Sequence, residues 1–293
     1  MTLRFDTITF LSDYGHVDEF VGVVRSVIRS IAPGVTVVDL THDIEPHDVR
    51  GGGLTLARSA QYLVPGVVLA VVDPGVATER RAIAVEVGGG QSVLVGPDNG
   101  LLAPAVAMVG GATRAVALTN TDYQLPAPGP TFAGRDVFAP AAAHLCNGVD
   151  LEELGNLVDP NSLMPGLMPV AREENGAIVG DVLWVDRYGN AQLNVDPDEV
   201  ASWGDRIRLR FGDASRTARR VDSYAALKTG EIGLVVDSYG LLSVSVDRGV
   251  AVRTRRAAVH PRSTRDADVT RVRRGRRTAG SPRRRSTRAA PRG

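Results

Sequence analysis

The sequence has almost no cysteine and no long apolar run, and each absence excludes a class of protein. The single cysteine, Cys146, rules out a disulfide within the chain and favours a reducing compartment. It follows a run of small and apolar residues at 141–145, which predicts a structural thiol packed at the end of a helix. No apolar run approaches the roughly 20 residues of a membrane span.

Two sequence signals for targeting and for phosphate binding are also missing. Arg4 and Asp6 place charges where a signal peptide needs an apolar core, so we expect a cytoplasmic protein with no membrane partner. The glycines at 88–90 are not followed by a helix, and no G-x-G-x-x-G motif opens a helix anywhere in the chain. A glycine-rich phosphate-binding loop is therefore not expected.

Charge is divided unevenly between the body of the chain and its C-terminal tail. Residues 253–293 hold 15 arginines and two acids, a net charge of +13, so the total of +1 leaves −12 for residues 1–252. The tail is rich in Arg, Ser, Thr, Ala and Pro and has too little apolar surface to fold. It has no aromatic side chain that could stack on bases. We expect a disordered tail, and nucleic-acid binding by its arginines is the less favoured alternative.

The order of the predicted elements over residues 1–160 indicates an α/β domain. A strand at 7–11, a helix at 19–31 and a strand at 35–40 form the β-α-β pattern of a parallel sheet. Further elements are expected at 48–63 (helix), 67–72 (strand), 82–87 with 92–95 (hairpin), 101–109 (helix) and 137–145 (helix). The central sheet is therefore expected to be mostly parallel.

A second domain with a different pattern is expected at residues 177–252. Residues 161–176 lack periodicity and are rich in Pro, Gly and Met, which is typical of a linker. The short strands that follow, separated by turns, predict a small all-β barrel. They are expected at 178–185, 190–195, 206–211, 232–237 and 242–246.

Polar residues follow several predicted strands of the first domain. Asp73 comes directly after a strand, Asp13 one residue beyond a strand, and Asn99 in the polar turn at 96–100 that follows the strand at 92–95. Because ligands bind at the carboxyl ends of strands in α/β sheets, we expect these residues and the turn at 132–136 to meet in one pocket. Carboxylates and amides suit hydroxyls and amines better than phosphates, so a nucleoside or an amino acid is the favoured ligand.

Arg80 follows Asp73 across a tight Pro-Gly turn, and Arg81 is the less favoured partner of the same carboxylate. An aspartate beside an arginine stays ionised and can accept a proton from water during a displacement reaction. The alternative is an ordinary surface turn with solvated charges.

The loop at 41–48 contains two histidines and three acids, a composition that suits a metal. Its spacing matches no helical ligand pair, and Pro46 interrupts it. We therefore expect the rim of a pocket and no metal site.

Six segments, in this order, resemble the S-adenosylmethionine hydroxide adenosyltransferases, which are relatives of the fluorinase and chlorinase. These segments are Ser-Asp-Tyr-Gly with Asp18, and residues 39–48, 72–81, 96–102, 131–140 and 186–190. The resemblance covers about residues 7–252, and its abrupt end would fit a change of reading frame in the gene. It implies an α/β domain followed by a β-barrel domain, and a homotrimer with its sites at subunit interfaces.

The resemblance implies an enzyme that hydrolyses S-adenosyl-L-methionine to adenosine and L-methionine, by in-line attack of water or hydroxide on the ribose 5′-carbon. S-adenosylmethionine is then the substrate, and no cofactor is needed. Asp13 would bind the ribose hydroxyls and Phe132 would line the ribose pocket. The other substrate-binding residues it implies are Asp186 and Ser238 for the methionine end, Asn190, Tyr188 and Tyr224 for adenine, and Asp18, Asn99 and Tyr239.

Asp73 and Arg80 match two members of the family's water-activating Asp-Arg-His set, but the third position is Ala133. The alanine is either an engineered change or a natural divergence. Since alanine cannot hydrogen-bond water, we expect substrate binding with slowed turnover; general acid–base groups contribute about 10²–10⁴-fold to rate. Two alternatives remain open: a chlorinase-like halogenase, for which Ala133 and Gly134 leave room for chloride, and a silent S-adenosylmethionine- or adenosine-binding protein.

Overall fold

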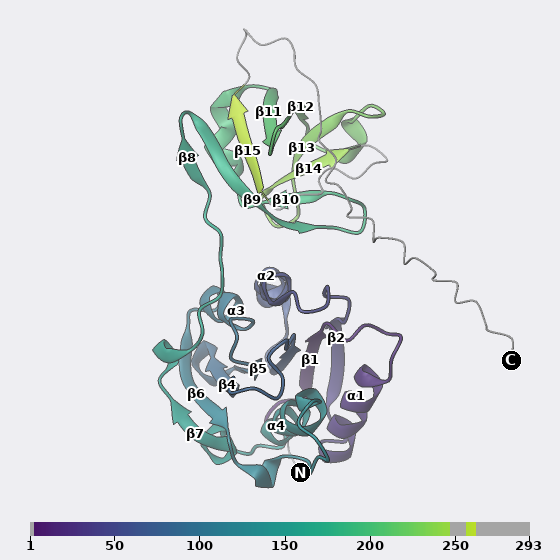
Figure 1. Cartoon of the computed structure of the whole chain (residues 1–293), viewed down its shortest axis with the longest axis vertical. Coiled ribbons are helices and arrows are strands. Elements are labelled where there is room, and N and C mark those ends of the chain that lie inside the picture. The colour runs from purple at the N-terminus through teal and green to yellow at the C-terminus, as the bar shows by residue number, and fades with distance from the viewer. Residues whose placement is uncertain (1–2, 247–255, 262–293) are drawn as a thin grey trace, which may run out of the picture.

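The computed structural model describes residues 3–246 and the backbone of residues 256–261, which form two domains joined by an extended segment (Figure 1). The first domain is built on a seven-stranded sheet with helices, and the second on a curled eight-stranded sheet. An α/β domain followed by a β domain, as the sequence predicts, is thereby confirmed. No helix in the described part of the chain is long and apolar enough to cross a membrane.

The sheet of the first domain is only half parallel. Strands β2, β1, β3 and β5 pair in parallel, whereas β4, β6 and β7 pair antiparallel. In spatial order the strands are β2 (Thr36–Thr41), β1 (Thr7–Ser12), β3 (Val67–Val71), β5 (Ser92–Pro97), β4 (Ala82–Val87), β6 (Ala112–Leu118) and β7 (Gly155–Val158). The expectation of a mostly parallel sheet is therefore wrong. The β4–β5 hairpin reverses direction, and β6 and β7, which the sequence analysis missed, extend the antiparallel half.

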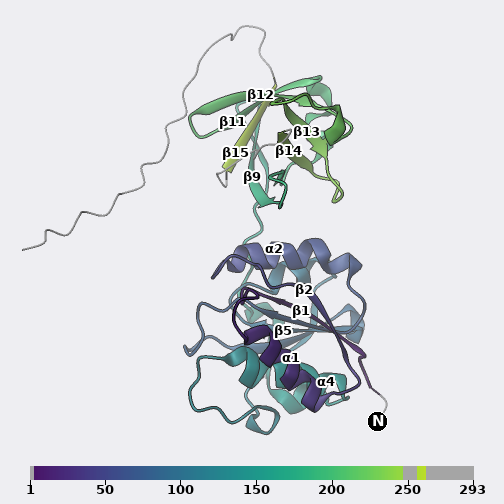
Figure 2. The ribbon, with the colours of Figure 1, turned by 90° about the vertical axis from the view of Figure 1, so that its right-hand side faces the viewer.

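Four helices cover the two faces of this sheet (Figures 1 and 2). Side chains alternate between the faces along each strand: Phe10 packs with α1 and α4, whereas Leu11 packs with α2 and α3. The helices are α1 (Phe20–Ile31), α2 (Val49–Ser59), α3 (Ala103–Met108) and α4 (Ala139–Cys146). Cys146 is fully buried at the end of α4, as expected.

Glycines in α2 allow this helix to lie close to the segment before α3. A Cβ atom on Gly53 would lie 3.0 Å from the carbonyl oxygen of Leu101, and one on Gly52 would lie 2.8 Å from the side chain of the same residue. Larger side chains would push α2 off the sheet.

The second domain is a curled sheet that includes two strands outside the range expected for it. In spatial order its strands are β10 (Ala191–Leu193), β14 (Leu242–Val246), β13 (Ile232–Val236), β12 (Ala214–Arg220), β11 (Arg206–Phe211), β15 (Arg256–Pro261), β9 (Ala177–Val185) and β8 (Arg172–Glu174), and β10 also pairs with β9. A 3-10 helix, Pro197–Trp203, and the parallel β12–β13 pair make the domain less regular than a simple antiparallel barrel. Strand β8 lies within the expected linker and β15 within the expected tail. The rest of that tail, residues 253–255 and 262–293, lies outside the described residues.

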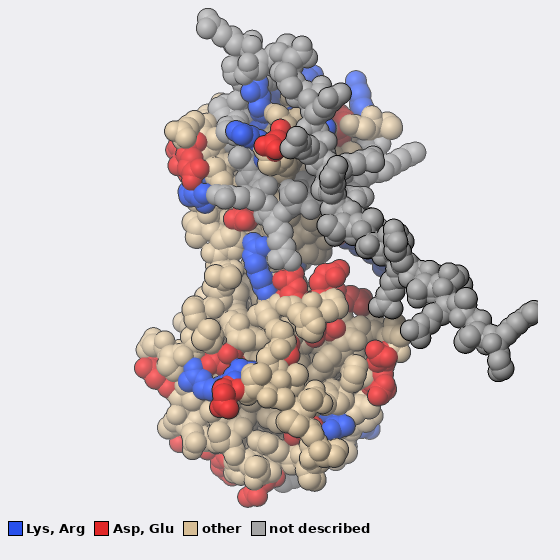
Figure 3. All heavy atoms as spheres, in the orientation of Figure 1, with Lys and Arg blue, Asp and Glu red and all other residues tan. Residues whose placement is uncertain are grey.

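Helix α2 faces the second domain and contacts strand β9 (Figure 2). The guanidinium of Arg58 lies 4.5 Å from the ring centroid of Trp184 and 6.0 Å from that of Tyr239. Cation–π contacts of this kind hold a charged side chain against an aromatic surface. On the face shown in Figure 3, acidic side chains gather where the first domain turns toward the second.

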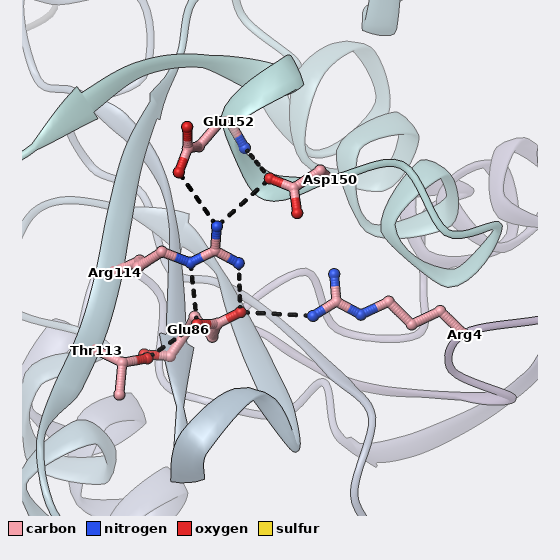
Figure 4. A network of polar contacts seen from close by, with 6 residues as sticks. All are labelled: Arg4, Glu86, Thr113, Arg114, Asp150 and Glu152. Carbon is pink, nitrogen blue, oxygen red and sulfur yellow. Dashed lines mark hydrogen bonds and ion pairs between the residues drawn. The ribbon is translucent and has the colours of Figure 1, made fainter.

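A polar network joins β4, β6 and the N-terminus at the end of the sheet where β5 begins (Figure 4). Glu86 is largely buried and accepts hydrogen bonds from Arg114, at 2.7 Å and 3.1 Å, and from Arg4 at 3.4 Å. Arg114 also contacts Asp150 and Glu152. Glu86 and Arg114 are direct cross-strand partners, so this network ties the antiparallel half together.

Candidate functional site

The carboxyl ends of β1 and β3 lie side by side and bring two predicted site residues together. Ser12 and Val71 are aligned in the parallel pairing, and the backbone N–H of Asp13 donates to the carbonyl of Val71 at 3.3 Å. Asp13 therefore lies at the same edge of the sheet as Asp73. Its Oδ2 atom accepts a hydrogen bond of 2.9 Å from the backbone N–H of His47, which fixes the carboxylate's orientation.

Arg80 forms a two-pronged ion pair with Asp73. Its Nε atom lies 2.9 Å from Oδ1 and 3.0 Å from Oδ2 of Asp73, and its Nη2 atom also contacts Oδ2. The side chains are only 15% and 6% exposed, so the carboxylate is held rigidly and mostly away from bulk water. The turn between them is tight enough to place Ala77 at φ 63°.

Arg81 takes a different direction. It donates to Asp98 at 2.8 Å and to the backbone carbonyl of Ser162 at 2.7 Å, which ties the segment after the first sheet to the end of β5. The preference for Arg80 over Arg81 as the partner of Asp73 is therefore confirmed.

The turn that carries Phe132 and Ala133 packs against this pair. Ala133 is buried and directly precedes the π-helical turn Gly134–Phe138. The guanidinium of Arg80 lies 5.2 Å from the ring centroid of Phe138, and that of Arg135 lies 5.0 Å from the ring of Phe132. Phe132 is thus held on one side of the site by a stacked cation.

Tyr14 belongs to the same cluster, although the sequence analysis did not include it among the site residues. Its ring lies 5.8 Å from that of Phe132, and its hydroxyl approaches Gly134 so closely that a Cβ atom there would lie 2.1 Å away. The only signal in the sequence was its position directly after Asp13. Tyr14 closes the space between the end of β1 and the turn at Ala133.

The loop at 41–48 forms part of the support for Asp13. His42 is buried, its Nδ1 atom lies 2.8 Å from Oγ of Ser12, and its Nε2 atom lies 3.2 Å from Oδ1 of Asp39. Burial lowers the pKa of His42, and the neighbouring Asp39 opposes this shift. In the described part of the chain, no group of three or more His, Cys, Asp or Glu side chains is placed to hold a metal ion.

Two other predicted residues of the first domain contribute less. The amide of Asn99 donates to the carbonyl of Val72 at 2.9 Å and accepts from the N–H of Leu101 at 3.1 Å, so it joins the ends of β3 and β5. These two hydrogen bonds use one of the two N–H donors of the Asn99 amide and its oxygen. Asp18 is exposed in the loop before α1.

The second domain contains a separate pocket that brings four predicted residues together. A cavity of about 540 Å³ is lined by Asp186, Tyr188, Asn190, Tyr224, Leu227, Ser245 and Val246. Oδ1 of Asp186 accepts from the backbone N–H groups of Tyr188 and Asn190, at 2.9 Å and 2.8 Å, and Oδ2 accepts from the Asn190 amide at 2.8 Å. One donor and the acceptor oxygen of that amide are left for a ligand.

Ser245 is a pocket residue that the sequence analysis missed. It is 2% exposed, and its hydroxyl has no hydrogen-bond partner among the described residues. Buried hydroxyls are normally satisfied, so this one, at the wall of the cavity, lacks a partner that the described residues do not supply.

Ser238 and Tyr239 lie on the neighbouring turn. Asp237 organises this turn by accepting from the N–H of Tyr239 at 2.9 Å and from the amide of Gln192 at 2.6 Å. Ser238 is exposed on it, and Tyr239 faces Arg58 at the domain junction. Among the described residues, no hydrogen bond or ion pair connects this domain's pocket with the cluster at Asp73.

The two halves of the chain match two family descriptions in order. Residues 8–155 match the S-adenosylmethionine (SAM) hydroxide adenosyltransferase N-terminal domain, and residues 180–262 match the C-terminal domain. The chain belongs to this family.

Relatives and a solved structure agree with this membership in the SAM hydroxide adenosyltransferase family. The chain is 41% identical over 244 residues to the (R)-S-adenosyl-L-methionine hydrolase of Salinispora tropica, covering 83% of this chain and 91% of that protein. It is 28% identical over 269 residues to a fluorinase of Actinopolyspora mzabensis, covering 81% and 89% of the two chains. The crystal structure of an uncharacterized conserved protein from Thermotoga maritima superposes with a TM-score of 0.79 at 32% identity, over 86% of this chain and 99% of that one.

The family match also corrects the expectation about the tail. It continues to residue 262, and strand β15, Arg256–Pro261, pairs with β9 and β11 within it. The expected end of the family pattern near residue 252 is therefore wrong, and nothing then supports a change of reading frame at that point.

Proposed function

We propose that this protein hydrolyses S-adenosyl-L-methionine to adenosine and L-methionine, by in-line attack of water on the ribose 5′-carbon. The observation that carries the proposal is the buried, two-pronged Asp73–Arg80 pair beside Asp13 at the carboxyl edge of the parallel strands. It supplies a rigid, ionic acceptor for a water molecule next to a carboxylate that suits ribose hydroxyls.

The reaction requires the protein mainly to orient the attacking water and the substrate. The sulfonium of the substrate is already a good leaving group, so we expect no cofactor. Arg80 fixes the plane of the Asp73 carboxylate, and Asp73 holds the water and accepts its proton as the C5′–O bond forms. Phe132 and Phe138, on the turn around Ala133, exclude bulk water from one side.

The substrate would extend from this cluster into a pocket of the kind seen in the second domain. Asp13 would accept both ribose hydroxyls, while Asn190 would reach the adenine edge between Tyr188 and Tyr224. The hydrogen bond from Asn190 to Asp186 supports this role because it fixes which way the amide points. Asp186 and Ser238 would bind the amino and carboxylate groups of methionine, with Tyr239 and Asp18 at the rim.

We propose that each site is shared between subunits of a homotrimer, between the first domain of one copy and the second domain of its neighbour. Each domain holds only part of the set of ligand groups. Large apolar side chains near the connecting segment also support this assembly, since Leu167 and Val170 are 78% and 79% exposed in one chain.

The activity is tested by incubating the protein with S-adenosylmethionine in ¹⁸O-labelled water. Adenosine and methionine should form together, and the label should appear on the adenosine 5′-hydroxyl. Asp73→Asn should abolish most of the turnover because it removes the ionic acceptor. Tight binding without any adenosine after long incubation would instead identify a silent binding protein.

Sharing of the site is tested by mixing two inactive proteins, Asp13→Ala and Asp186→Ala. Exchange of subunits should restore part of the activity, because some interfaces then combine an intact first domain with an intact second domain. Two proteins that remain inactive after exchange, confirmed by mass measurement of mixed trimers, would place the whole site within one chain.

The halogenase alternative loses support from the structure. It relied on space for chloride beside Ala133 and Gly134, but the Tyr14 hydroxyl lies against Gly134. The same incubation in chloride buffer should yield adenosine and no 5′-chloro-5′-deoxyadenosine.

We place this reaction in the cytoplasm. This follows the expectation from the single cysteine of the sequence; in the structure Cys146 is buried, and burial raises its pKa to about 12, which makes it an unreactive packing group.

A further inference from the structure

The Asp73–Arg80 pair has no third polar partner from the turn that carries Ala133. Both carboxylate oxygens of Asp73 already accept hydrogen bonds from Arg80. A water held by Asp73 alone can rotate about that contact, whereas in-line displacement needs an oxygen with a fixed direction. A second hydrogen-bonding group near the pair would remove that freedom.

Tyr14 carries a hydroxyl whose position is fixed by packing. Its ring is edge-on to Phe132 at 5.8 Å and tilted against Phe20 at 5.5 Å, and it also meets Phe10 at 6.5 Å. Its backbone N–H donates to Oγ of Ser12 at 3.3 Å. Ring contacts on several sides leave the side chain little rotational freedom.

The hydroxyl points to the backbone of the turn that carries Ala133. A Cβ atom on Gly134 would lie 2.1 Å from Oη and 3.1 Å from Cζ of Tyr14, and Gly134 directly follows Ala133. The close approach is possible only because residue 134 has no side chain. The phenol oxygen thus lies at the turn that offers no polar side chain of its own at position 133.

This hydroxyl is not used by the protein itself. Among the described residues, it has no hydrogen-bond partner, although Asp13, Asp73 and Arg80 all act on it electrostatically. Burial first, and then the charges of Asp13 and Asp73, raise the pKa of Tyr14 far above its usual range, while Arg80 opposes the shift. A neutral phenol keeps both a donor and acceptor lone pairs for a water molecule.

We propose that the Tyr14 hydroxyl holds the attacking water against Asp73 and so performs part of the task that Ala133 cannot. This inference rests on the hydrolysis proposed above. The water oxygen forms the C5′–O bond while the C5′–S bond breaks and its electron pair passes to sulfur, which gives adenosine and methionine. The proton lost by water passes to Asp73, and Tyr14 keeps its own.

The variant Tyr14→Phe removes only the hydroxyl and tests this role. We expect kcat to fall about tenfold or more, because a lost positioning contact of about 1.4 kcal/mol changes a rate tenfold. KM, the calorimetric Kd for S-adenosylmethionine and the Tm should stay close to those of the unaltered protein. Tyr123→Phe is the matched control, since its hydroxyl bonds Glu153 at the surface, and it should leave kcat unchanged.

Two further variants distinguish water positioning from packing. Gly134→Ala keeps the phenol but displaces it, and should also lower kcat. In an Ala133→His background the histidine supplies the second contact to the water. Tyr14→Phe should then lower kcat less than about threefold, so the effects of the two substitutions are not additive in a double-mutant cycle.

The outcomes separate this inference from the proposed function. A Tyr14→Phe protein that hydrolyses at the original kcat overturns the role of Tyr14 and leaves the hydrolase intact. If Tyr14→Phe weakens binding by the same factor as it lowers kcat, or clearly lowers Tm, the side chain has a packing role. That result would also overturn the role of Tyr14 in holding water. If the unaltered protein forms no adenosine, the proposed function fails, and the role of Tyr14 fails with it.

Discussion

The Oγ atom of Ser12 lies 2.8 Å from Nδ1 of His42, and this buried contact joins the end of β1 to the loop after β2. The carbonyl of His42 also accepts a hydrogen bond of 2.8 Å from the N–H of Gly15. Asp13 and Tyr14 lie between these two contacts. His42 therefore supports the segment that carries one proposed ribose ligand and one proposed water ligand.

Replacing His42 should weaken both stability and binding. His42→Ala leaves the Ser12 hydroxyl with only the Tyr14 N–H as a partner and opens a cavity beside Phe10, at a cost of roughly 2–3 kcal/mol in the free energy of unfolding. His42→Asn places an amide oxygen near the Nδ1 position and should cost less. Urea unfolding and calorimetry with S-adenosylmethionine measure both effects. The exposed neighbour His16, changed to Ala, is the control and should shift stability by less than about 0.5 kcal/mol.

The pH dependence of stability should also report His42. Because burial lowers its pKa below the ordinary 6.5, the unfolded chain binds more protons than the folded protein just below that pH. Its contribution to stability is complete above pH 6.5 and is lost as the pH falls through the folded-state pKa. The difference in unfolding free energy between the unaltered protein and His42→Asn should therefore shrink from pH 7 to pH 5. An unchanged difference would contradict this assignment.

The Asp73–Arg80 geometry predicts that charge alone is not enough at position 80. Arg80→Lys keeps the charge but cannot hold both oxygens of Asp73, so kcat should fall about 10²-fold. Arg81→Lys is the control: it loosens the contacts to Asp98 and Ser162 and should lower Tm with little change in kcat. Equal effects of the two changes on kcat would remove Arg80 from the reacting centre.

Placing an imidazole at position 133 should accelerate the reaction. Ala133→His supplies a group that can orient water and share its proton, and kcat should rise by about 10–10²-fold, within the range of general acid–base effects. Ala133→Phe controls for filling the same buried space without a hydrogen-bonding group and should not accelerate turnover. A histidine variant no faster than the present protein would show that this turn does not face the water.

The network around Glu86 predicts a second pH effect, which acts on stability alone. The hydrogen bonds from Arg114 hold the pKa of Glu86 below its usual value, so its contribution is complete above about pH 4.5 and is lost as the pH falls further. Glu86→Gln should cost roughly 2 kcal/mol at pH 7, because it replaces the charge-assisted hydrogen bonds that the buried Glu86 carboxylate accepts from Arg114 and Arg4 with weaker neutral ones. The cost should diminish toward pH 3.

The exposed residue Glu152, changed to Gln, is the control for that measurement and should change little at either pH. Neither change should alter KM for S-adenosylmethionine, since this network lies at the end of the sheet opposite Asp13 and Asp73. A pH-independent cost of Glu86→Gln would contradict the assigned ionisation.

Local patterns were enough to predict much of the arrangement of residues at the candidate site. Period-2 and period-3.6 apolar patterns predicted the strands and helices that place Asp13 and Asp73 at one edge, because parallel strands share their carboxyl ends. The pairing of Asp73 with Arg80 was also predictable, since only a short turn separates them. In the second domain, the turn from Asp186 to Asn190 is held by hydrogen bonds between its own residues, so it was predictable for the same reason.

Contacts between distant segments were not predictable from these patterns. Nothing in the pattern around residue 134 indicates that Tyr14 fills the space beside it, or that His42 reaches Ser12, because these contacts depend on how whole elements pack. The strand at 256–261 was hidden by its arginine-rich surroundings, and only its pairing with β9 and β11 identifies it.

The sequence by itself thus determined the family, the order of the elements and the alanine at position 133. Tertiary structure decided which side chains surround Ala133. The geometry of a turn depends on a few adjacent residues and can be predicted from them. A cluster such as Tyr14, Asp73 and Gly134 forms only when the sheet and the turn at 133–138 pack together.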